Sequence, residues 1–76
     1  MSERLPAVKP RQLIRALEGR GWSVERISGS HHILVHAELR RVLSVPLHNR
    51  ELKTGTLIGI LRVAEISRDE LSRLLE

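Results

Sequence analysis

The sequence has no cysteine, no phenylalanine and no tyrosine, and Trp22 is its single large aromatic side chain. The absence of cysteine excludes a disulfide framework and thiolate chemistry. With one ring to stack on bases, an RNA-recognition motif, which relies on aromatic side chains, is also excluded. No apolar stretch approaches the roughly 20 residues that a membrane span needs, and the first residues lack the apolar run of a signal peptide. We therefore expect a soluble, cytoplasmic protein.

The length and charge of the chain favour a surface site that acts on a polymer. We expect one domain over 1–76, which buries only about 60–65% of the surface that its unfolded chain exposes, so a deep substrate cavity is not expected. The net charge is +4 and comes mainly from arginine, whose planar fork suits phosphate groups. A polyanion such as RNA is therefore a plausible partner, bound with an affinity that falls steeply with salt. The alternative is that the arginines only keep the domain soluble.

Apolar periodicity and turn signals predict an α+β fold in which a three-stranded antiparallel sheet carries the helices on one face. Residues 1–8 are expected to be a frayed arm. The predicted elements are a helix from Pro10 to a left-handed cap at Gly21, strands at 22–27, 31–36 and 41–45, a helix carrying Leu57–Ala64, and a short helix after a capping box of Ser67 and Glu70. On the first helix, Arg11 and Arg15 lie one turn apart on the polar face.

The chain has four histidines, of which three lie in the second predicted strand. A zinc site is disfavoured, because His32 and His36 would be about 13 Å apart along a strand that rises about 3.3 Å per residue. Histidine as a base is favoured, since its ordinary pKa near 6.5 gives both protonation states at neutral pH. His32 is the candidate, and it would face out on the open side of the sheet if Ile33 and Val35 belong to the core. The equally weighted alternative is that the histidines are ordinary strand residues.

Other residues are candidates for holding phosphate. Gly29 and Ser30 precede the histidine pair at a turn where a backbone can approach a phosphate closely. The segment Lys53–Thr54–Gly55–Thr56 leads into a helix, whose N-terminus favours anions, although plain helix capping by Thr54 is the stronger alternative. His48 can reach a phosphate or be a solvated loop residue, and His36 is expected to be structural or to have no role.

An ordered set of motifs resembles the HicA family of toxins. The set is Gly21–Trp22, Gly29–Ser30–His31–His32, Val45–Pro46 followed by His48, Glu51–Leu52–Lys53–Thr54–Gly55–Thr56–Leu57, and Ala64 followed by Ile66–Ser67. The resemblance implies a fold like the double-stranded-RNA-binding domain, α-β-β-β-α, with a short C-terminal helix added here. It also implies a metal-independent mRNA interferase without cofactors, whose catalytic histidine corresponds to His32, neutralised by a HicB-type antitoxin. His31 would lie beside the bound RNA.

The sequence departs from this family at two places, Thr54, where proline is common, and Ala37–Arg40, where the family's turn has Asp-Gly. Three hypotheses stay open: a ribonuclease toxin, a non-catalytic RNA- or DNA-binding module, and an interaction domain that has lost its activity. Within the first, the second proton transfer falls to His48, to His32 itself or to water.

Overall fold

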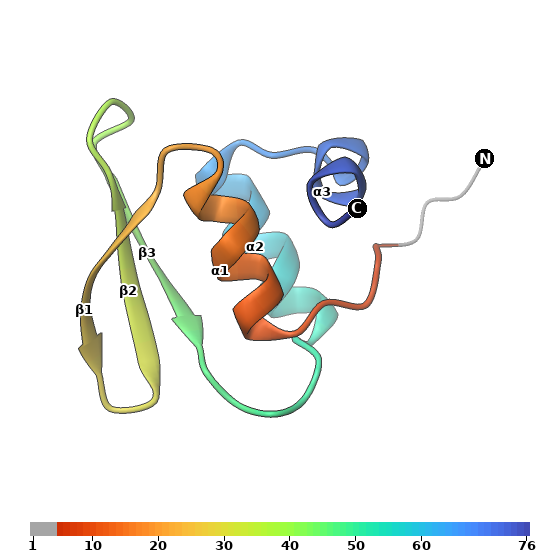
Figure 1. Cartoon of the computed structure of the whole chain (residues 1–76), viewed down its shortest axis with the longest axis horizontal. Helices are drawn as coiled ribbons and strands as arrows, with labels where there is room; N and C mark the ends of the chain where they lie inside the picture. Colours follow the sequence, from red (N-terminus) through yellow and green to blue (C-terminus); the bar gives the residue numbers. More distant parts are fainter. Residues whose placement is uncertain (1–4) are drawn as a thin grey trace.

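In the computed structural model, which describes residues 5–76, a three-stranded antiparallel sheet carries two helices side by side on one face (Figure 1). The elements are α1 (Pro10–Glu18), β1 (Ser23–Ser28), β2 (His31–His36), β3 (Arg41–Pro46), α2 (Thr54–Ala64) and α3 (Arg68–Leu74). This is the predicted order, an α-β-β-β-α arrangement like that of double-stranded-RNA-binding domains with one short helix added. None of the described helices is long and apolar enough to cross a membrane.

The two faces of the sheet are assigned by strand pairing, with β2 in the centre. Leu34 pairs with Leu43, and both are buried under the helices. His32 lies two residues before Leu34 and therefore shares its face. Val35 lies on the other face, opposite Val42, which is 62% exposed. The prediction that Ile33 and Val35 form the core while His32 faces outward is therefore wrong, because the strand is turned the other way.

An irregularity in β1 separates the two ends of that strand. The pairing with β2 shifts register between Val24 and Arg26, which leaves one extra residue, as in a β-bulge. Beyond the shift, Ile27 pairs with His32 and is 62% exposed. Trp22, which we placed in the strand, precedes it and is buried. The bulge thus leaves an apolar side chain uncovered beside His32.

The structure contains both of the predicted helix caps, the left-handed cap after α1 and the capping box before α3. Helix α1 ends at Glu18, and the chain continues to Gly21, which has the positive φ of +95° expected of a left-handed cap. The Trp22 N–H donates to the Leu17 carbonyl at 3.1 Å and the Gly21 N–H to the Glu18 carbonyl at 3.3 Å, the bond pair of a Schellman motif. At the other end of the chain, Ser67 and Glu70 form the predicted capping box of α3.

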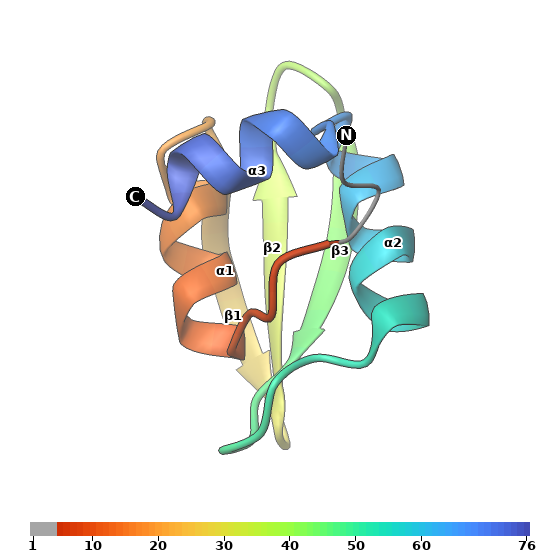
Figure 2. The same cartoon turned by 90° about the vertical axis from the view of Figure 1, so that its right-hand side faces the viewer.

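A third layer covers the helices on the side away from the sheet (Figure 2). It consists of α3 and the segment that leads into α1. In this segment Val8 is fully buried, and its carbonyl accepts a hydrogen bond of 2.8 Å from the Leu52 N–H. Leu5 also packs against the core. The prediction of a frayed arm is therefore wrong for residues 5–8, because Leu5 and Val8 pack against the core. Residues 1–4 lie outside the described part of the chain.

Candidate functional site

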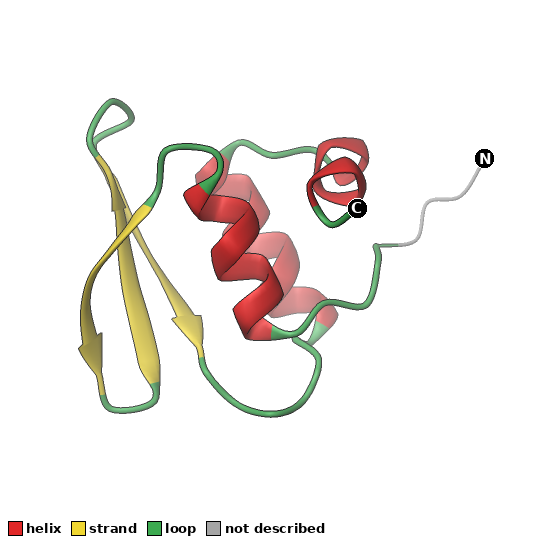
Figure 3. Cartoon of the chain, in the orientation of Figure 1, coloured by secondary structure: helices red, strands yellow, loops and turns green. Residues whose placement is uncertain are grey.

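One end of the sheet gathers most of the residues that the sequence singles out. The β1–β2 turn, the loop from β3 to α2 and the first turns of both long helices lie at this end (Figure 3). The Leu47 N–H donates to the Ser30 carbonyl at 2.6 Å. This bond ties the turn that precedes His31 and His32 to the loop that carries His48.

His32 lies in a hollow between β2 and α1. The hollow has a volume of about 250 Å³ and is lined by one face of α1, by two strand residues and by the first residue after β3, namely Arg11, Ile14, Arg15, Glu18, Val24, His32 and Leu47. The ring is half-buried. Within residues 5–76, His32 Nδ1 is the one buried side-chain nitrogen or oxygen that has no hydrogen-bond partner. The fold itself therefore leaves one nitrogen of this ring unsatisfied, and the residue lines the hollow.

The turn before His32 is open to solvent. Gly29 has a φ of +59°, and a Cβ added there would meet no atom within 4 Å. Ser30 and His31 are exposed, and His31 pairs with Pro46 on the face opposite to that of His32. Gly29 and Ser30 thus stand at the same end as the hollow, whereas His31 points away from it. Contact of these three residues with phosphate stays a prediction.

His48 and Lys53 line a different hollow, of about 400 Å³, together with Asn49, Arg50 and Glu51. The His48 Nδ1 accepts a hydrogen bond of 3.1 Å from the Arg50 N–H. That bond leaves Nε2 as the nitrogen of this exposed ring that can meet a ligand. The structure therefore does not bring His48 into the hollow of His32.

The start of α2 has no side-chain cap. Lys53 occupies the N-cap position and makes no side-chain capping bond, and Thr54 is the first residue of the helix. The alternative that Thr54 caps this helix is therefore wrong. The first N–H groups of the helix and its positive dipole end stay available to an anion. Binding of a phosphate at Lys53 and Thr54 stays a prediction.

His36 is a structural residue, as predicted. Its Nδ1 accepts a hydrogen bond of 3.2 Å from the Leu39 N–H, and its Nε2 lies 3.1 Å from the Arg20 carbonyl. A carbonyl only accepts, so the ring carries its hydrogen on Nε2 and both nitrogens are satisfied. The ring also meets Trp22 edge to face, with the centroids 5.3 Å apart.

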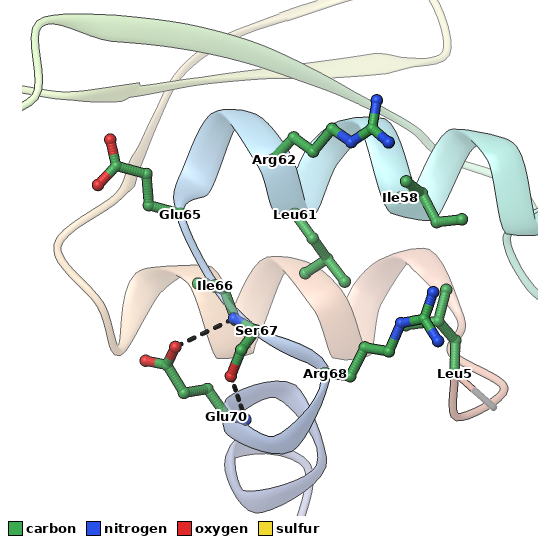
Figure 4. A pocket seen from close by; sticks show the side chains of 9 residues that line it. All are labelled: Leu5, Ile58, Leu61, Arg62, Glu65, Ile66, Ser67, Arg68 and Glu70. Atoms are coloured by element: carbon green, nitrogen blue, oxygen red, sulfur yellow. Dashed lines mark hydrogen bonds between the residues drawn. The ribbon is translucent and has the colours of Figure 1, made fainter. Parts of the chain in front are cut away.

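A larger hollow, of about 430 Å³, contains no histidine (Figure 4). It lies between α2 and α3, with Ile58, Leu61 and Ile66 as apolar lining and charged side chains at its edge. Hydrogen bonds between Ser67 and Glu70 close one side of it. Within residues 5–76 no three histidine or carboxylate side chains form a cluster able to hold a metal ion. The His32 hollow, which is lined by a histidine with an unsatisfied nitrogen, is the best candidate for a chemical site.

Sequence reasoning missed the part of this site that α1 supplies. Arg11, Arg15 and Glu18 line the hollow, although Arg11 and Arg15 were predicted only to lie on the polar face of the helix, and Glu18 was not singled out. Their spacing of four and three residues, which puts all three on one side of a helix, is the signal that indicates a shared surface.

Residues 10–66 match the family model described as the HicA toxin of bacterial toxin–antitoxin. The match covers α1, the three strands and α2, and so includes every residue that lines the His32 hollow. No curated protein matches the chain.

Proposed function

Because the chain belongs to the HicA toxin family, a family of toxins that act in pairs with an antitoxin, we propose that it is an endoribonuclease. In this proposal it cleaves mRNA at the His32 hollow without a metal ion, and a HicB-type antitoxin blocks the reaction by covering that hollow. RNA is preferred over other polyanions because its 2′-hydroxyl supplies the nucleophile, so that a histidine is sufficient for the chemistry.

The observation that carries the proposal is the unsatisfied ring of His32. A buried polar atom without a partner lowers stability by about 1–3 kcal/mol, and such atoms are rare in folded proteins. Leu34 and Val45, two of the same-face neighbours of His32, are apolar and fully buried, and the third, Ile27, is apolar and exposed. An apolar side chain would therefore suit this position better. We therefore attribute the presence of a histidine here to proton transfer with an RNA bound in the hollow.

The proposed reaction moves two protons. The 2′-oxygen of one nucleotide attacks the neighbouring phosphorus and gives its proton to a base, while the bond from phosphorus to the 5′-oxygen breaks and that oxygen takes a proton from an acid. His32 performs one of these transfers at the ring nitrogen that meets the ligand. The second transfer is assigned to water or to His32 in a later step, because no other histidine lines the hollow. His48 and Lys53, which share another hollow, are assigned to phosphate binding.

The test compares wild-type protein with His32→Ala and His31→Ala on labelled mRNA in EDTA, after circular dichroism has shown equal folding. His31 is the matched control, since it is the same residue type in the next position and lies on the opposite face. We expect His32→Ala to lose cleavage by about 10²–10⁴-fold, the usual contribution of acid–base catalysis. His31→Ala removes at most a phosphate contact, so its loss of cleavage should not exceed about tenfold.

Other outcomes would overturn the proposal. Equal cleavage by all three proteins would exclude His32 as the catalytic residue. Salt-sensitive RNA binding by the wild type without cleavage would favour the non-catalytic RNA-binding module. Binding to the antitoxin with neither RNA binding nor cleavage would favour an interaction domain that has lost its activity.

A further inference from the structure

Arg11 and Arg15, both on α1, are among the described arginines that form no ion pair. Arg20 forms an ion pair with Glu70, and Arg41 forms one with Glu65 at 2.7 Å. Within residues 5–76, neither Arg11 nor Arg15 has a carboxylate oxygen within 4.0 Å. Glu18 lies three residues after Arg15 on the same helix, and even these two do not pair. Both guanidinium groups therefore keep their full hydrogen-bonding capacity for a ligand.

The unpaired arginines lie where the proposed reaction needs positive charge. Both line the hollow that contains His32. They are one helical turn apart, a spacing that puts their side chains on the same side of α1. The guanidinium fork matches two oxygens of a phosphate. The volume of about 250 Å³ is below the range of about 300–1,000 Å³ typical of small-molecule sites, which fits a strand of polymer passing across the hollow.

We infer that Arg11 and Arg15 hold the phosphate backbone of RNA against His32, and that Glu18 marks where the phosphates leave the hollow. Glu18 is the one carboxylate among the lining residues, and its negative charge repels a phosphate at that end of α1. The backbone then runs along the first two turns of the helix. This inference rests on the proposed function for its ligand, and it assigns the RNA-binding role to two particular arginines.

The alternative is that Arg11 and Arg15 have a structural role and do not bind RNA. Arg11 and Arg15 also border a second hollow, of about 290 Å³, beside the end of α3, where Leu74, Leu75 and Glu76 contribute to the lining. If the arginines served only to pack this corner, their removal would lower the free energy of unfolding and leave RNA binding per folded molecule unchanged.

The experiment measures binding of a labelled single-stranded RNA at several salt concentrations. It uses His32→Ala as the background, so that the RNA stays intact, and adds Arg11→Gln, Arg15→Gln or both. We expect each substitution to weaken binding about tenfold, the loss of one charge-assisted hydrogen bond. The slope of log affinity against log salt should fall by about 0.7 per arginine, as expected for one phosphate contact with a single strand.

Three further variants make the result specific. Arg73→Gln, on the exposed side of α3 and outside these hollows, removes the same charge elsewhere and should leave the slope unchanged. Arg15→Lys should retain the slope, because it keeps the charge, while losing part of the affinity with the fork. Glu18→Gln should tighten RNA binding, because it removes the repelling carboxylate.

Unchanged slopes in both arginine variants, or equal losses in Arg73→Gln, would overturn the inference. The proposed function is judged separately, by cleavage in wild-type protein and its loss in His32→Ala. If cleavage depends on His32 while the arginine slopes do not change, the inference alone fails. If the wild type binds RNA without cleaving it, the slopes still decide whether these arginines contact phosphate.

Discussion

His32 and His36 lie four residues apart on the helix-facing side of β2, and they differ in what surrounds each ring. His36 lies at the end of the sheet where α1 leads into β1, and its two nitrogens and its edge are all in contact with protein groups. His32 lies at the other end, where α1 begins, and its buried Nδ1 has no partner. The same side chain thus has both ring nitrogens hydrogen-bonded at one end of the strand, and a buried nitrogen without a partner at the other.

The two ends of the sheet differ in how completely the rest of the chain covers the histidine. At the His36 end, the chain returns over the sheet through Gly21 and Trp22, and the ring is enclosed. At the His32 end, the bulge in β1 leaves Ile27 exposed beside the ring, and α1 presents two arginines to the hollow as well as Ile14. The cover over His32 is therefore incomplete, and in the proposed function this is where RNA approaches the ring.

The largest effect on stability is expected from His36→Leu. This change removes two hydrogen bonds and an edge-to-face contact with Trp22, so we expect the free energy of unfolding to fall by about 3 kcal/mol. Urea denaturation measures the loss. At low temperature, where the variant stays folded, cleavage should be retained. Loss of cleavage without loss of stability would show that His36 does not differ from His32 in the way proposed.

Gly21→Ala should produce the next largest effect, at the same end of the sheet. A Cβ at this position would lie 2.7 Å from His36 Nε2, and the backbone has a φ of +95°. We expect a loss of about 2 kcal/mol, because the left-handed conformation costs a residue with a Cβ about 1–2 kcal/mol and the imidazole must also move. Thermal unfolding followed by circular dichroism measures it.

Gly29→Ala is the matched control at the His32 end. Its φ is +59°, but a Cβ there would meet no atom within 4 Å. It should therefore show only the conformational part of the loss, about 1 kcal/mol. Equal losses at the two glycines would mean that the contact with His36 adds nothing.

The order of the elements was predictable because the periodicities are strong and the caps are specific. Leu57, Ile60, Leu61 and Ala64 repeat with helical spacing and are all buried. The capping box before α3 depends on two residues close in sequence, so it needed no knowledge of the rest of the fold.

The orientation of β2 was not predictable from its own residues. The strand has apolar residues on both faces, with Ile33 and Val35 on one and Leu34 on the other. The face with two aliphatic residues was predicted to face the core, and this was the wrong face. The neighbouring strand held the signal, since Ser44 lies opposite Ile33 whereas Leu43 lies opposite Leu34. Burial in a central strand is decided by such partners, which a single segment does not contain.

The contribution of Arg11 and Arg15 to the site could not be predicted from the sequence for a related reason. A basic residue on the polar side of a helix has the same pattern whether it meets solvent, a carboxylate or RNA. Only the packing of α1 against β2 shows that Arg11 and Arg15 share a hollow with His32, and this packing depends on the orientation of β2.

Arg40→Gly tests the turn that follows His36 and should have a smaller effect. Arg40 has a φ of +54°, a conformation that glycine adopts without a steric cost, and its N–H donates to the His36 carbonyl at 2.9 Å. We expect the free energy of unfolding to rise by about 0.5–1 kcal/mol. Ala37→Gly, in the same turn but without a positive φ, should give no gain, and a gain there would show that general loosening of the turn is responsible.

The smallest effect is expected from His32→Leu, the counterpart of His36→Leu. Leucine is apolar and of similar size, and it removes a buried nitrogen that has no partner. Replacing an unsatisfied polar group in this way is nearly neutral or stabilising, so we expect the free energy of unfolding to change by less than about 0.5 kcal/mol or to rise. Urea denaturation of both leucine variants side by side measures the difference, which should be about 3 kcal/mol. Equal losses would show that both rings support the fold, and the loss of cleavage in His32→Ala would then have to be separated from a loss of structure around the hollow.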